Sequence, residues 1–327
     1  MAASFGLVAG ILPPEWQRNN PTTLEILMKY GLSSPVVESI IPITEDEYDR
    51  ISAATDALLA YTALEEKFDL VAENYIEFET SLLQIATQMM LQGGHNHGSM
   101  HAQRRLLNRR LTNLLSSAQT YIDCSGQHLA DMKPGDKQIV DRLKKRFSEQ
   151  YDQRLGYRAM VCIRNHAQHF DDPVHGISFP SKWDKERTKL QFTVILHLHP
   201  QQLSFNSKFK KSVLKELIAL GPIIDLKPLT RGFVEALSIV HEGTRQETKA
   251  IVAGLEEVIT ATIGKFEEAH PRAKTVGLAA VRILDSGEHD QPVNLMKDFL
   301  SYFDVLRKKN KLGANVSDRC VTGEILD

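Results

Sequence analysis

The feature that most constrains the fold of this chain is an apolar repeat that continues unbroken from Tyr48 to Met89. Its members follow one another at steps of three or four residues, or sums of such steps, which is the spacing of one helix face. Thr44 can cap the start of this helix, and Gly93-Gly94 ends it. Such a helix is about 70 Å long at about 1.5 Å per residue. The chain is therefore expected to fold around very long helices.

The rest of the sequence predicts further helices and a few strands. Helical spacing continues over residues 102–132, 137–170, 207–220, 227–269 and 294–311. Residues 187–199 alternate apolar and polar side chains, as a strand does, with 174–183 as hairpin partner and 275–284 as a third strand. Prolines punctuate the first 44 residues, where only residues 22–30 read as a short helix.

These elements predict a mainly α chain, a long-helix bundle with a small antiparallel β-sheet insertion. We expect three parts: an irregular N-terminal segment (1–44), a helical bundle (45–173), and a small antiparallel sheet with long helices (174–327). The total of 327 residues fits two domains or one large one.

Charge is distributed unevenly along the two central helical segments. Residues 45–91 hold 11 acidic and 2 basic side chains, whereas residues 101–170 hold 13 basic and 6 acidic ones. The two segments can attract each other within one fold, or the basic one can face an anionic partner.

Cysteine usage and hydropathy indicate a cytoplasmic chain with no membrane association. The three cysteines are far apart and odd in number, which fits a reducing compartment. No apolar run reaches the roughly 18 residues of a membrane helix, and the opening segment has no basic region of a secretory signal.

The sharpest cluster of chemically capable residues is at the end of the segment 137–170. Arg164 is followed directly by Asn165, and His169 lies one turn later on the face of Asn165. A guanidinium can hold a phosphate with two hydrogen bonds, an imidazole transfers protons near neutral pH, and an amide can orient either group. The sequence Asp171-Asp172-Pro173 then stops the helix.

This arrangement, Arg164-Asn165-x-x-x-His169, resembles the motif of the HEPN superfamily. The resemblance covers about residues 101–175 and implies a HEPN-like helical core. Many such proteins are metal-independent ribonucleases of toxin–antitoxin and phage-defence systems, and they usually dimerise so that two motifs face each other. The resemblance implies catalytic roles for Arg164, Asn165 and His169. It also implies a supporting polar residue from the preceding helix. Asn108, Asn113 and Asp123 are candidates by type, of which we take Asn113 and Asp123.

Basic side chains near the motif are candidates for binding an RNA backbone. Arg105 and Arg109 lie on one helix face, and Lys144 and Lys145 belong to a second basic run. Solvated helix faces are the other interpretation of these runs.

Several patterns also have a purely structural interpretation. Arg164 can pair with an acid of residues 45–91, Asn165 can be buried, and His169 can cap the helix C-terminus. A second pattern, Arg282 with His289, lacks the Asn and is read as chance. His95, His97 and His101 lie in a glycine-rich stretch without a completing ligand, so we expect a mobile loop and no metal.

The sequence therefore predicts a metal-independent, cofactor-free endoribonuclease of HEPN type, a toxin or phage-defence effector. Its expected partners are RNA, a second copy of the chain, and an antitoxin or other regulatory protein. The alternative is a non-catalytic helical scaffold that binds RNA or protein, which the long helices favour.

Overall fold

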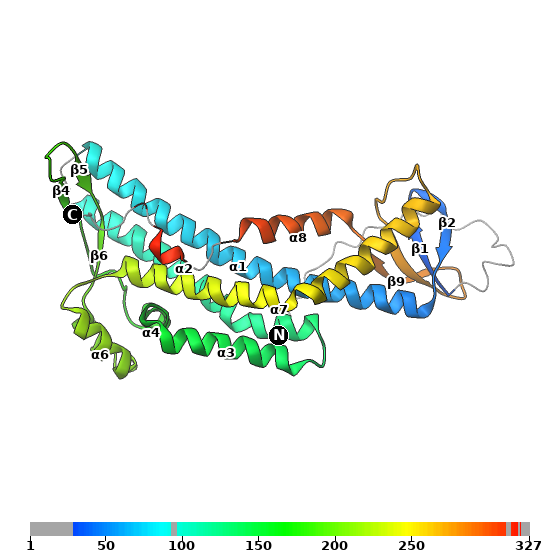
Figure 1. The fold of residues 1–327 in the computed structure, drawn as a ribbon, viewed down its shortest axis with the longest axis horizontal. Helices are drawn as coiled ribbons and strands as arrows, with labels where there is room; N and C mark the ends of the chain where they lie inside the picture. Colours follow the sequence, from blue (N-terminus) through cyan, green and yellow to red (C-terminus); the bar gives the residue numbers. More distant parts are fainter. Residues whose placement is uncertain (1–28, 93–96, 312–314, 320, 322–327) are drawn as a thin grey trace. The chain divides into compact units, whose positions relative to one another are not determined.

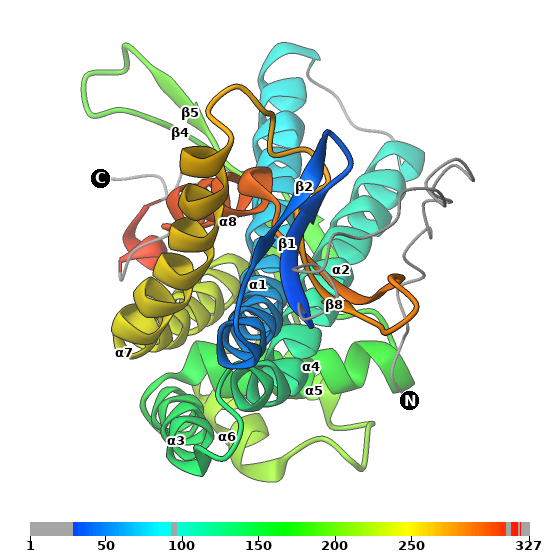
Figure 2. The same ribbon diagram turned by 90° about the vertical axis from the view of Figure 1, so that its right-hand side faces the viewer.

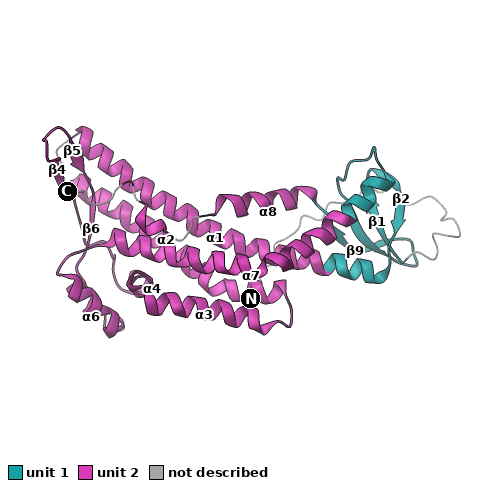
Figure 3. Ribbon diagram, viewed as in Figure 1, with its two compact units in different colours: residues 1–52, 262–296 teal, residues 53–261, 297–327 magenta. Residues whose placement is uncertain are grey.

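The computed structural model describes residues 29–92, 97–311, 315–319 and 321. The chain divides into two compact units, residues 1–52 with 262–296 and residues 53–261 with 297–327 (Figure 3). The described helices are α1 (Glu45–Gln92), α2 (His97–Met132), α3 (Lys137–Gln153), α4 (Leu155–His169), α5 (Pro200–Leu203), α6 (Lys211–Leu220), α7 (Leu226–Ala269) and α8 (Lys297–Lys309), with a 3₁₀ turn at Val316–Asp318. The described strands are β1 (Tyr30–Ser34), β2 (Val37–Pro42), β3 (Gly176–Ser178), β4 (Ser181–Trp183), β5 (Leu190–Phe192), β6 (Ile195–Leu198), β7 (Ile224–Asp225), β8 (Ala279–Ile283) and β9 (His289–Asn294). The predicted mainly α class with small antiparallel sheets is confirmed.

The first unit is built on an antiparallel sheet with strand order β2-β1-β8-β9, whose first three strands lie side by side in Figure 2. Leu32 of β1 is fully buried and pairs with Ile41 on one side and Ala280 on the other. The start of α1 is held by a reciprocal cap, in which Thr44 and Glu47 each accept a hydrogen bond from the other's backbone N–H. The predicted cap at Thr44 is therefore confirmed.

The second unit is a bundle in which α1, α2 and α7 run alongside one another (Figure 1). Their apolar faces meet in a core that includes Phe68 of α1, Tyr121 of α2 and Val240 of α7, none of which is exposed. The rings of Phe68 and Tyr121 pack edge to face at 5.4 Å. The apolar residues that recur at helical spacing in the sequence are thus the buried faces of the helices in one bundle.

A polar network lies inside this bundle. The Glu65 carboxylate, fully buried, accepts hydrogen bonds from Arg245 Nη2 at 2.5 Å and Arg245 Nε at 2.9 Å, and it lies 3.2 Å from His241 Nε2. Tyr121 Oη lies 3.1 Å from His241 Nδ1. Burial alone raises the pKa of Glu65, but the bonds from His241 and Arg245 outweigh it and lower the pKa to about 2. The network therefore links α1, α2 and α7 through an ionised carboxylate.

The acidic face of α1 is neutralised mainly by α7 and α8 within the bundle. Glu79 pairs with Arg231 of α7 at 2.7 Å, and Glu73 pairs with Lys309 of α8 at 2.7 Å. The expected attraction between α1 and the basic α2 is represented by the pair Glu77–Arg110. Arg105 and Arg109 of α2 and Lys137 and Lys144 of α3 take part in no ion pair with any described residue.

Two smaller sheets follow α4, and both are antiparallel. β6 pairs with β3 and β7, and β5 pairs with β4. The predicted hairpin of 174–183 with 187–199 is therefore confirmed, although each half is two short strands. The strand predicted within 275–284 is confirmed as β8, but the expectation that it joins this sheet is wrong, because β8 pairs with β1 and β9.

Two other expectations need correction. Residues 30–42 form a β-hairpin rather than irregular chain, because β1 gains a partner, β8, from the far end of the sequence. The predicted helix over 22–30 lies largely outside the described residues, and Tyr30 belongs to β1.

The predicted single helix over 137–170 is wrong at one point. Arg154 is extended, with φ −120° and ψ 113°, and separates α3 from α4. Its guanidinium pairs with the nearly buried Glu235 of α7 at 2.6 Å. Gly156, in the first turn of α4, packs directly on the α7 backbone, since an added Cβ would lie 2.8 Å from the Leu229 carbonyl oxygen. These contacts with α7 explain why the helix breaks at Arg154 and α4 starts in a new direction. The sequence around Arg154 alone does not predict them.

None of the helices described combines the length and apolar character that crossing a membrane requires.

Candidate functional site

The predicted motif occupies the last two turns of α4. Tyr157, Met160 and Ile163 bury one face of this helix. The Phe170 N–H donates to the His166 carbonyl oxygen and closes the last turn, and the Asp171-Asp172-Pro173 run follows. Because one side of α4 is packed, the residues on its other sides face outward near its C-terminus.

Arg164 and Asn165 interact directly on this outer side. Arg164 Nη1 donates to Asn165 Oδ1 at 3.0 Å. Arg164 is half-buried, and its Nε finds no hydrogen-bond partner among the described residues. No described carboxylate pairs with it, so the predicted alternative of an ion pair with α1 is wrong. Asn165 is exposed, which contradicts its alternative interpretation as a buried residue.

His169, the last residue of α4, is exposed and makes no hydrogen bond with any described residue. The buried histidine of the motif is instead His166, three residues earlier. His166 Nδ1 lies 3.2 Å from Asn206 Nδ2, and its ring packs against Phe170 at 5.0 Å and Phe209 at 6.1 Å. Burial lowers the pKa of His166, against the opposing charge of Asp171. The two histidines thus have different environments: one is structural and the other is available to a ligand.

A clamp from α2 holds the chain that leaves α4. The buried Asn108 donates through Nδ2 to the Val174 carbonyl oxygen at 3.1 Å and accepts from the Val174 N–H at 2.8 Å. Arg104 Nη1 also donates to the Val174 carbonyl oxygen, at 3.3 Å. Of the three polar candidates on α2, the structure therefore ties Asn108 to the motif segment.

The two residues taken as supporting lie elsewhere on α2. Asn113 is exposed, and Asp123 is exposed and accepts a hydrogen bond from Gln119 at 2.7 Å. Asp123 follows Asn108 by 15 residues, or about 22 Å of helix at about 1.5 Å per residue. No hydrogen bond or ion pair among the described residues links Asn113 or Asp123 to α4, so a supporting role for them has no geometric basis.

The predicted RNA-binding side chains fall into two places. Arg105 and Arg109 are exposed on the stretch of α2 that also carries Arg104 and Asn108, and so adjoin the clamp. Lys144 and Lys145 are exposed on α3, where the neighbouring Arg142 and Arg146 pair with Glu247 of α7. Of the two pairs, only Arg105 and Arg109 lie beside Asn108, the residue that binds the segment after α4.

Histidines also gather where β3 and β6 meet, just after the clamped segment. His175 Nδ1 accepts the His199 N–H at 2.9 Å, and His197 Nε2 lies 2.7 Å from Ser178 Oγ. Burial, reinforced by the nearby His199 and His166, lowers the pKa of His175 to about 4. Burial also lowers the pKa of His197, so the His175 and His197 imidazoles are neutral at pH 7. Within the described residues no group of three or more His, Cys, Asp or Glu is arranged to hold a metal ion.

Two sequence features remain outside this region. His95 and the side chain of His97 lie outside the described residues, and His101 is exposed at the start of α2. Arg282 pairs with Asp290 at 2.5 Å in the β8–β9 hairpin, so the second Arg–His pattern is not on a helix. Cys124 and Cys162 are free.

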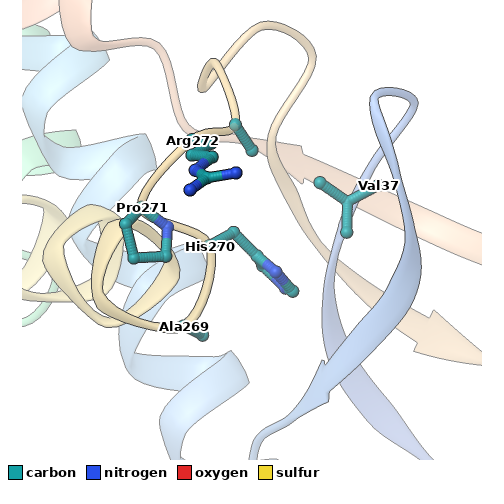
Figure 4. Close-up of a pocket in the computed structure, with 6 residues that line it drawn as sticks. Val37, Ala269, His270, Pro271 and Arg272 are labelled. Atoms are coloured by element: carbon teal, nitrogen blue, oxygen red, sulfur yellow. The ribbon is translucent and has the colours of Figure 1, made fainter.

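A shallow pocket occurs in the first unit, between the turn after α7 and β2 (Figure 4). Val37, His270 and Arg272 line it, and His270 Nε2 lies 3.4 Å from Ser39 Oγ. It contains none of the residues that the sequence singled out.

Sequence reasoning missed the roles of Asn108 and His166. In both cases a signal exists, since each polar residue falls on the apolar stripe of its own helix. Asn108 lies between Leu107 and Leu111, and His166 lies three residues after Ile163. A polar side chain at a core position is usually hydrogen-bonded there, as both are.

Comparison with protein-family models, curated proteins and solved structures finds no match to this chain.

Proposed function

We propose that this chain is a metal-independent endoribonuclease of HEPN type, acting in the cytoplasm as a toxin or phage-defence effector. The observation that carries the proposal is the set of partners of the Arg164 guanidinium. Its Nη1 donates to Asn165, no carboxylate among the described residues pairs with it, and the exposed His169 follows five residues later on the same helix. An unneutralised guanidinium and an accessible imidazole near one helix end suit a phosphate anion.

The proposed reaction needs only protein groups. His169 takes the proton of an RNA 2′-hydroxyl, the 2′-oxygen bonds to the adjacent phosphorus, and the bond from phosphorus to the 5′-oxygen breaks. The leaving oxygen receives a proton, so the products are a cyclic phosphate and a 5′-hydroxyl. Arg164 stabilises the extra negative charge of the transition state, and Asn165 orients the guanidinium through their hydrogen bond. The second proton-transfer group comes from the motif of a second copy.

The basic surface contributes to holding the substrate. Arg105 and Arg109 contact the RNA backbone beside the motif, and Lys144 and Lys145 extend the positive field along α3. A free ribonuclease harms its host, so an antitoxin or other regulatory protein is part of the proposal.

Expression without a control partner tests this proposal. The wild type is expected to slow bacterial growth and shorten cellular RNA, and Arg164→Ala or His169→Ala is expected to abolish both effects at equal protein levels. Gln168→Ala, an exposed neighbour on the same turn, is the matched control and keeps toxicity. RNA shortening that persists in His169→Ala contradicts the proposal.

One observation favours the second candidate, a non-catalytic scaffold. Ile76, Leu83 and Met90 are exposed at seven-residue intervals along α1, which is the spacing of a helix-binding seam. On this alternative the wild type leaves RNA intact, and Leu83→Lys removes binding to a helical partner.

A further inference from the structure

Two exposed aromatic rings flank the C-terminal end of α4. Phe170, directly after the helix, is 53% exposed, and Phe205, in the segment between α5 and α6, is 75% exposed. Large aromatic side chains normally bury their area, because each removes much apolar surface from water. These two rings are left open to solvent, next to the candidate site.

Both rings belong to segments that pack on one buried imidazole. The Phe170 ring lies 5.0 Å from the His166 ring, and Asn206, the residue after Phe205, lies 3.2 Å from His166 Nδ1. Phe209 completes the contact at 6.1 Å and anchors the Phe205 segment to α4. The contacts of His166 therefore hold the segments that carry the two exposed rings at the end of the helix that carries Arg164 and His169.

The Phe205 segment is also basic. Lys208 and Lys211 are exposed and form no ion pair with any described residue, and the Lys208 N–H donates to Asn206 Oδ1 at 3.0 Å, which shapes the turn. Lys210 is engaged with Tyr151 Oη at 2.6 Å. The acid nearest to Phe205 in the sequence, Glu216, pairs with Arg158 of α4, and Asp171 and Asp172 follow Phe170. Exposed rings interleaved with lysines favour a polyanion that carries flat apolar groups.

We infer that Phe170 and Phe205, here called the stacking platform, stack on unpaired bases of the RNA and are binding residues of this site. This inference rests on the proposed ribonuclease function and names residues that hold its substrate. Bases stack on aromatic side chains irrespective of their identity, while lysines hold the backbone. A duplex cannot use the platform, because its bases are already stacked inside the helix.

Phe205 is the residue to test, since its high exposure means that substitution removes little buried area. The probes are a fluorescent 12-nucleotide single-stranded RNA carrying 2-aminopurine and a duplex RNA of the same length. Binding is measured on the full chain carrying His169→Ala, so that the RNA stays intact. Phe205→Ala and Phe205→Leu are expected to weaken single-strand binding about tenfold and to lose the 2-aminopurine quenching, because leucine is apolar but lacks a π face.

Three controls define the expected pattern. Phe205→Trp keeps a ring and keeps the affinity and quenching. Trp183→Ala, which removes a ring that is 53% exposed on the β4–β5 hairpin, leaves binding unchanged. Duplex binding is the same for wild type and Phe205→Ala.

The possible outcomes distinguish a failure of the stacking platform from a failure of the proposed ribonuclease function. If Phe205→Ala binds the single strand as well as wild type while the unmutated chain still cleaves RNA, the platform is wrong and the proposed function stands. If Phe205→Leu retains full binding, the surface is a general apolar contact of the kind a protein partner uses, and the platform is wrong. If the chain neither binds nor cleaves RNA, both proposals fail.

Discussion

At the scale of single residues, His166 and His169 carry opposite roles within one helical turn. His166 is buried and contacts Asn206, Phe170 and Phe209, whereas His169 is exposed and makes no hydrogen bond or ring contact with any described residue. His166→Ala is expected to lower the free energy of unfolding by about 2–3 kcal/mol, because it leaves a cavity and an unpaired amide. His169→Ala is expected to leave it within about 0.5 kcal/mol of wild type. Urea unfolding followed by circular dichroism measures both, and equal losses would mean that His169 is structural.

His175 makes folding stability depend on pH. Its pKa in the folded chain, about 4, lies below the ordinary value of 6.5. An unfolded chain therefore takes up a proton at this residue before the folded chain does, and stability, complete above about pH 6.5, falls as the pH drops toward 4. His175→Asn keeps an acceptor for the His199 N–H and is expected to flatten this fall by up to about 3 kcal/mol. Unfolding free energies at pH 7, 5.5 and 4.5 measure the change, and an unaltered slope would refute the assignment.

At the scale of elements, the close approach of α4 to α7 depends on Gly156. Because a Cβ there would lie 2.8 Å from the Leu229 carbonyl oxygen, Gly156→Ala has to push the helices apart and is expected to cost about 1–3 kcal/mol. Gly254→Ala is the matched control. This α7 glycine has no atom within 4 Å of an added Cβ, so the substitution should stabilise the chain by about 0.5–1 kcal/mol. Thermal unfolding compares them, and equal shifts would contradict the packing argument.

The long helices could be predicted from sequence because their periodicity is local and sustained. α1 begins at its predicted cap, and α7 covers Leu226–Ala269 against a predicted 227–269. The β1–β2 hairpin could not be predicted, because what makes it a strand pair is β8, far along the chain. The break at Arg154 was missed for the same reason, since its cause is Glu235 and the α7 backbone.

The candidate site was only partly predictable. Arg164, Asn165 and His169 stood out by type and order, and in the structure Asn165 and His169 are exposed while Arg164 is half-buried and bonded to Asn165. The position of Asn108 on the apolar stripe of α2 is a signal that Asn113 lacks, but its partner, the Val174 backbone, comes from a different element and could not be predicted. The platform residue Phe205 carries no sequence signal of its own, since an exposed and a buried phenylalanine look alike.

At the scale of the whole molecule, the proposed chemistry needs two copies of the motif. One copy supplies a single accessible imidazole at the end of α4, and the leaving oxygen needs a second proton-transfer group. We therefore expect a homodimer in solution, with a mass twice the 36.8 kDa of one chain. Light scattering at tens of micromolar measures this, and a stable single-chain mass that accompanies full cleavage activity would exclude the two-motif arrangement.

The most direct test of the central claim is the initial rate of cleavage of a defined single-stranded RNA in the presence of EDTA. The wild type is expected to cleave it and leave cyclic-phosphate ends, because the proposed reaction uses protein side chains alone. His169→Ala is expected to be slower by about 10²–10⁴-fold, the usual loss on removing a general base, with its unfolding free energy unchanged. His289→Ala, from the second Arg–His pattern, should match the wild type. Equal rates for wild type and His169→Ala, or loss of cleavage on chelation, would contradict the account.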